Sequence, residues 1–181
     1  MIANEEWLTP TRASGIAAYG VALTNCGIVW ARAKGARSVR KIAAWLTAIE
    51  GVLLLDMIVD GRWILHQFFV NIAQNKHEYS LRRSPQVILV TFLLGILFLS
   101  LYFSLRLFRA KTGAFVAVSG ASLSLIIWCI EVVSLHQVDA ILYYPVGRWM
   151  VVSLVWIVAC LTTSVGILLE ERRANTATPV D

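Results

Sequence analysis

The chain has little charge for its length. Only 15% of its 181 residues are Asp, Glu, Lys or Arg, and 58% are apolar, whereas soluble domains have about 25% charged and about 45–50% apolar residues. We therefore do not expect a water-soluble globule. Proline and cysteine are also scarce, with 4 and 3 residues, which argues against a disordered chain, a collagen-like chain and a disulfide-stapled module.

Common catalytic motifs are absent as well. The sequence contains no Gly-rich phosphate loop and no HExxH motif. Cys26, Cys129 and Cys160 each lie within an apolar segment and form no CxxC pair, so we interpret them as buried structural cysteines. The sequence therefore favours a protein that is not an enzyme.

Long apolar runs are the main feature that is present. Three predicted helices, over 85–107, 112–137 and 147–170, have uncharged cores longer than the roughly 17 residues that a bilayer requires. A fourth, over 42–70, is long enough to cross although charged residues interrupt it. Backbone groups in lipid must be hydrogen-bonded internally, and the alternating pattern of a β-barrel is missing. The sequence therefore predicts an all-α, polytopic transmembrane helical bundle that forms a single domain over 1–181.

A fifth, N-terminal helix is predicted over 13–31. This segment is uncharged, but Gly15, Gly20 and Gly27 dilute its hydrophobicity. Small residues allow helices to approach closely. The segment can span the bilayer, lie in its interface or pack against the other helices, and we expect it to span.

The distribution of Lys and Arg predicts the orientation. Ten of them fall in the connections on one side of the predicted spans and in the C-terminal tail, five fall on the other side, and Arg62 lies inside a helix. The positive-inside rule places the richer side and the C-terminus in the cytoplasm, and the N-terminus outside if 13–31 spans. We predict a location in the cell inner membrane. The basic residues then contact lipid headgroups rather than nucleic acid.

Polar residues gather at one depth of the predicted bundle. Counted at about 1.5 Å per residue along 42–70, Glu50 falls near the middle of the bilayer and His66 at its outer boundary. The residues Asp56, Asp60 and Arg62 lie in the outer half between them. On the helix over 112–137, Glu131 and His136 reach the same outer level, with Asp139 just beyond.

Rotation by about 100° per residue distributes these side chains around the helix over 42–70. Asp56 and Asp60 share one face, Arg62 and His66 share another, and Glu50 points along a third. A helix that is polar on three sides is expected at the centre of the bundle or at an oligomer contact.

Arg62 needs a partner because its guanidinium group stays charged. Glu131 is the leading candidate, with Asp60 and Asp139 as alternatives. The simplest interpretation of the polar cluster is an ion-pair network between helices.

Two ligand hypotheses use the same cluster. A b-type haem would be held by His66 and His136, with Arg62 or Arg148 near a propionate, and quinol oxidation would use a histidine and a carboxylate. A divalent metal would be held by nitrogen and oxygen ligands, namely His66, His136, Glu131 and either Asp60 or Asp139.

Buried carboxylates lead to a third hypothesis, in which Glu50 and Asp56 relay protons in a channel or transporter. One such helix with three apolar neighbours needs further copies to form a pore. The small residues Gly120, Ala121 and Ser124 are expected to support that assembly.

These observations favour a small, non-catalytic integral membrane protein that acts through helix packing. Its expected partners are the lipid bilayer and either further copies of itself or a larger membrane complex. The alternatives are a redox subunit that binds haem or quinol and a proton-linked channel or transporter. The sequence does not separate the three.

Overall fold

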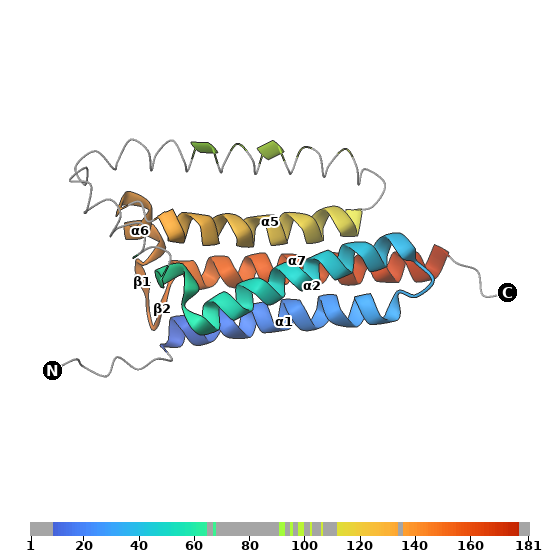
Figure 1. Ribbon diagram of the computed structural model, residues 1–181, viewed down its shortest axis with the longest axis horizontal. Coiled ribbons are helices and arrows are strands. Elements are labelled where there is room, and N and C mark those ends of the chain that lie inside the picture. The colour runs from blue at the N-terminus through green and yellow to red at the C-terminus, as the bar shows by residue number, and fades with distance from the viewer. Residues whose placement is uncertain are drawn as a thin grey trace.

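The computed structural model describes residues 9–64, 112–133 and 136–177, together with a few single positions between 67 and 106. Long helices lie side by side in it (Figure 1). The elements are α1 (Pro10–Arg32), α2 (Arg37–Val59), α5 (Thr112–Val133), α6 (His136–Leu142), β1 (Pro145–Val146), β2 (Trp149–Met150) and α7 (Val151–Ala177). Most of the helix predicted over 85–107 lies outside the described residues.

Four described helices, α1, α2, α5 and α7, are long and apolar enough to cross a membrane. Their most apolar windows have mean hydropathies of 1.2, 2.0, 2.0 and 2.3, so α1 is the least lipophilic of the four. These lengths and compositions are those of helices in integral membrane proteins. The all-α prediction is confirmed, and the N-terminal segment over 13–31 forms one of these candidate spans.

Local sequence explains why α1 begins where it does. Thr9 has an extended backbone, and its hydroxyl oxygen accepts a hydrogen bond from the Arg12 amide at 3.2 Å. Pro10 occupies the first turn, where its missing N–H has no cost. Helix α1 therefore begins three residues before the predicted segment.

The helix predicted over 42–70 is shorter than expected. Helix α2 begins at Arg37 and ends at Val59, because Asp60 adopts the left-handed conformation with φ 60° and ψ 35°. Aspartate tolerates this conformation better than most residues, and a helix commonly stops at such a position. Residues 61–64 are helical again after this break. The predicted angle between Asp56 and Arg62 assumes one continuous helix, so it is wrong across the break at Asp60.

Helix α7, rather than α2, is the central helix of the described bundle. It packs against α1, α5 and α2 (Figure 1). Half of its apolar window is buried, 50% against 28% for α2. One face of α2 remains exposed and apolar, with Trp45, Val52 and Leu55 on it. The polar residues of α2 do not make it central, because Asp56 pairs with Arg62 and Asp60, just after the helix, pairs with Arg12.

Small residues bring α5 and α7 into backbone contact. A Cβ atom on Gly120 would lie 2.5 Å from the Thr163 amide nitrogen of α7. Ala121 and Ser124 are also buried, at 2% and 0% exposed. The prediction that Gly120, Ala121 and Ser124 support assembly with other copies is wrong, because packing within the chain uses them.

The segment between α5 and α7 folds into a short helix and a tight hairpin. Pro145 pairs with Met150 and Val146 with Trp149 in the antiparallel hairpin, and Gly147 supplies the positive φ of 66° at its turn. Residues 147–150 therefore belong to the hairpin, and α7 begins at Val151 rather than at the predicted residue 147. Of the predicted helix over 112–137, the structure describes α5 as far as Val133 and then α6 from His136.

At the opposite end of the bundle, Glu170 of α7 caps α5. Its carboxylate Oε2 accepts a hydrogen bond from the Ala114 amide at 3.2 Å, and Glu170 is 4% exposed. Ala114 lies in the first turn of α5, where amides have no partner within the helix and the helix dipole favours a negative charge.

We expect Glu170→Ala to lower the free energy of unfolding by about 1–2 kcal/mol, the usual cost of a lost N-terminal cap. Glu170→Gln keeps an oxygen acceptor but removes the charge, so its loss should be smaller. Thermal unfolding in detergent compares the two variants. Equal losses for both would show that the cap acts through charge alone, and no loss for Glu170→Ala would contradict the capping role.

Candidate functional site

The polar cluster lies at the end of the bundle where α2 and α5 terminate, and Arg62 is its centre. The Arg62 Nη1 atom donates to the Glu131 Oε2 atom of α5 at 2.7 Å, and its Nε atom lies 3.5 Å from the Asp56 Oδ2 atom of α2. The side chains are 11%, 2% and 11% exposed for Arg62, Glu131 and Asp56. The structure confirms the predicted Arg62–Glu131 ion pair between helices.

Two aromatic side chains complete the surroundings of this pair. The Arg62 guanidinium carbon lies 5.1 Å from the centre of a Trp156 ring of α7, which is a cation–π distance. The Tyr143 hydroxyl donates to the Glu131 Oε1 atom at 3.1 Å. Burial and the neighbouring Glu131 carboxylate raise the pKa of the Tyr143 phenol above its usual value, so the phenol keeps the proton that it donates.

The break at Asp60 is what brings Asp56 and Arg62 together. A continuous helix would separate these residues by six positions, or about 240° at 100° per residue. With the left-handed residue at Asp60, the chain turns back and the Arg62 guanidinium reaches Asp56. The Asp60–Gly61 dipeptide is a common turn signal, and it is the sequence feature that marks this break.

A second ion pair joins the start of α1 to the end of α2. The Arg12 guanidinium donates to the Met57 and Ile58 carbonyl oxygens at 3.1 and 3.0 Å and to the Asp60 Oδ2 atom at 3.4 Å. These carbonyls belong to the last turn of α2, where acceptors lack helical partners. This role of Arg12 was not predicted from the sequence. Its position near the start of α1, opposite the end of the antiparallel α2, was the available signal.

The remaining predicted site residues are only partly brought together. Asp60 pairs with Arg12, and Asp139 lies on α6 at the same end of the bundle. Arg148 is exposed in the hairpin turn and forms no ion pair with the described acidic residues. His66 lies outside the described residues, as does the side chain of His136.

Ion pairs and a tyrosine hydrogen bond engage two of the carboxylates that a metal would use. Arg62 and Tyr143 engage both oxygens of Glu131, and Arg12 engages Asp60. Among the residues that the structure describes, no three His, Cys, Asp or Glu side chains are grouped to hold a metal ion. The haem, quinol and metal hypotheses depend on His66 and His136, so they remain predictions.

Glu50 is separate from this cluster. It lies near the middle of α2 and is 0% exposed, and the Cys160 thiol lies 4.0 Å from its Oε2 atom. Asp56, which the sequence grouped with Glu50 as a possible proton relay, instead pairs with Arg62. Cys26 and Cys160 are buried as expected, and Cys129 is half-buried.

Comparison of the chain with protein-family models, with curated proteins and with solved structures found no significant match.

Proposed function

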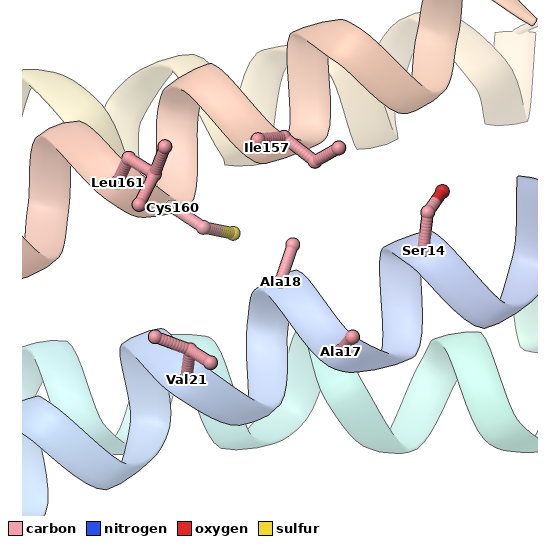
Figure 2. A pocket seen from close by; sticks show the side chains of 7 residues that line it. All are labelled: Ser14, Ala17, Ala18, Val21, Ile157, Cys160 and Leu161. Carbon is pink, nitrogen blue, oxygen red and sulfur yellow. The ribbon is translucent and has the colours of Figure 1, made fainter.

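We propose that this chain is a non-catalytic integral membrane protein that acts by packing against a second copy of itself through α1. The observation that carries this proposal is a groove of about 280 Å³ between α1 and α7 (Figure 2). Its lining is small or apolar and consists of Ser14, Ala17, Ala18, Val21, Ile157, Cys160 and Leu161.

The exposed face of α1 beside this groove is built for close helix contact. Ala17, Val21 and Thr24 are exposed on it, and a Cβ atom on Gly20 would meet nothing within 4 Å. The Thr24 hydroxyl donates to the Gly20 carbonyl oxygen at 2.7 Å, so the face presents no unsatisfied polar group there. Small residues of this kind let helices approach closely in membranes.

A second copy is the partner that fits this face best. The face is uncharged and small, so it is complementary to itself, as a two-fold symmetric interface requires. Helix α1 is also the least lipophilic candidate span, and a protein neighbour suits such a helix better than lipid does. The ion pairs at the bundle end are satisfied within the chain, so they support a structural role rather than a ligand site.

We also propose that the end of the bundle opposite the Arg62 cluster faces the cytoplasm of a cell inner membrane. The loop between α1 and α2, the start of α2 and the end of α7 lie at that end (Figure 1). They carry Arg32, Lys34, Arg37, Arg40, Lys41, Arg172 and Arg173. This clustering supports the orientation through the positive-inside rule.

A matched pair of alanine substitutions tests the self-association. Ala17 on α1 and Ala48 on α2 are both exposed within candidate spans, but only Ala17 lines the groove. We expect Ala17→Leu to weaken association at least about tenfold, which corresponds to about 1.4 kcal/mol, because the added bulk prevents close approach. Ala48→Leu should leave it unchanged.

Energy transfer between labelled copies in proteoliposomes, measured against protein-to-lipid ratio, gives the affinity. Thermal unfolding of each variant checks that folding is unchanged. A wild-type chain that stays monomeric at every ratio would contradict the proposal. Equal effects of the two substitutions would contradict the assignment to α1.

A further inference from the structure

Glu50 is a buried carboxyl group with no charged partner among the described residues. It is 0% exposed, and its Oε1 atom forms no hydrogen bond in the described part of the chain. The three ion pairs found there involve other acids. An isolated carboxylate is very costly in apolar surroundings, so such a group is normally neutral or balanced by a cation.

The described neighbours of Glu50 come from α1, α5 and α7. Thr163 and Cys160 of α7 flank the carboxyl, and Cys26 on α1 is the next titratable group. Tyr19 on α1 is also within electrostatic range. Helix α5 contributes the Ser124 hydroxyl beside Cys160 and no titratable group that acts on Glu50. All these groups are neutral in their ordinary protonation states at pH 7.

The hydrogen bonding of Thr163 indicates which group carries a proton. The Thr163 hydroxyl donates its only proton to the Ala159 carbonyl oxygen at 3.1 Å. Toward Glu50, therefore, Thr163 offers lone pairs alone. An ionised carboxylate also offers lone pairs alone, and the two would repel. A protonated carboxyl group can instead donate to the Thr163 oxygen.

We propose that Glu50 is a proton-binding site in the interior of the bundle, held as a neutral carboxylic acid beside the Thr163 hydroxyl. When it releases the proton, the carboxyl O–H bond breaks, the proton passes to water, and a negative charge remains with no cation beside it among the described residues. Cys160 contacts both this carboxyl and the groove between α1 and α7 (Figure 2). The site therefore lies one side chain from the groove, and it does not depend on self-association.

Infrared spectroscopy of the full chain in lipid tests the proposal. A protonated carboxyl group absorbs separately from a carboxylate. We expect a carboxylic-acid band at neutral pH that disappears in Glu50→Gln and remains in the control Glu171→Gln, whose target is also buried. The band should be lost reversibly as the pH is raised. Its absence from the wild-type chain at neutral pH, or its persistence in Glu50→Gln, would overturn the proposal.

Two further measurements guard against a variant that fails to fold. Thr163→Val removes the hydroxyl beside Glu50 but keeps the carboxyl, so the band should shift in frequency rather than vanish, whereas an unshifted band would contradict the role of Thr163. The wild-type titration is repeated with sodium and with a large organic cation. Identical titrations support a proton site, and loss of the band only in sodium would assign the site to a metal cation instead.

Discussion

Arg62→Ala is expected to destabilise the chain more than any other single removal of charge, by about 3–5 kcal/mol, the range found when one partner of a buried ion pair is deleted. The substitution would leave Glu131, which is 2% exposed, without its cation, and Asp56 at 11% exposed would lose the same partner. It would also remove the guanidinium group beside Trp156. Thermal unfolding in detergent measures this loss.

Arg148→Ala is the matched control for this prediction. Arg148 is exposed in the hairpin turn, and exposed substitutions away from special features usually change stability by no more than about 0.5 kcal/mol. Equal losses for the two arginine variants would refute the importance of the buried pair.

The second large effect is expected at the contact between α5 and α7. A Cβ atom on Gly166 would collide with the Ala117 amide nitrogen and lie 2.8 Å from the Gly113 carbonyl oxygen. Both obstacles are backbone atoms, so no side-chain rotation relieves the contact. We expect Gly166→Ala to cost about 3 kcal/mol, at the upper end for overpacked interiors, and to separate the two helices.

Gly27→Ala provides the comparison, because it makes the same chemical change on α1. A Cβ atom on Gly27 would meet nothing within 4 Å, so the higher helix propensity of alanine should leave stability unchanged or raise it by up to about 1 kcal/mol. Unfolding midpoints of the two variants test the difference. A Gly166→Ala protein as stable as the wild type would contradict the close packing of α5 and α7.

The Arg62–Glu131 pair could be predicted from the sequence because depth along a helix follows directly from residue count. Arg62 and Glu131 fall at the same level on two segments that run in the same direction, and a buried guanidinium group needs an acid. This argument requires only the rise per residue. It therefore held although the helix that carries Arg62 breaks two residues earlier.

The face of a helix on which a residue lies could not be predicted in the same way. Its angle is a sum over all preceding residues, so a single irregular residue makes the calculated face wrong. The left-handed Asp60 moves Arg62 toward Asp56 and places Asp60 against Arg12. Asp60–Gly61 is a turn signal, but it lies inside an apolar run, so one continuous helix was predicted there.

The element that packs against each face of small residues could not be predicted from the sequence either. Gly120 and Ser124 belong to a face that suits either another copy or another helix of the same chain, and composition does not distinguish these outcomes. The structure shows that this face packs within the chain, because Gly120 lies directly against the α7 backbone. The capping of α5 by Glu170 was missed for the same reason, because its donor and acceptor are 56 residues apart.

A double-mutant cycle between Arg62 and Glu131 tests most directly whether the polar cluster holds the helices together. The unfolding free energies of Arg62→Met, Glu131→Gln and the double variant are compared with the wild type; the loss of the Asp56 partner is common to both Arg62 variants and cancels. The account predicts that the double variant loses about 2 kcal/mol or more less unfolding free energy than the two single losses added together. This difference lies within the range for contacting residues. Simple additivity would show that the two side chains do not stabilise each other.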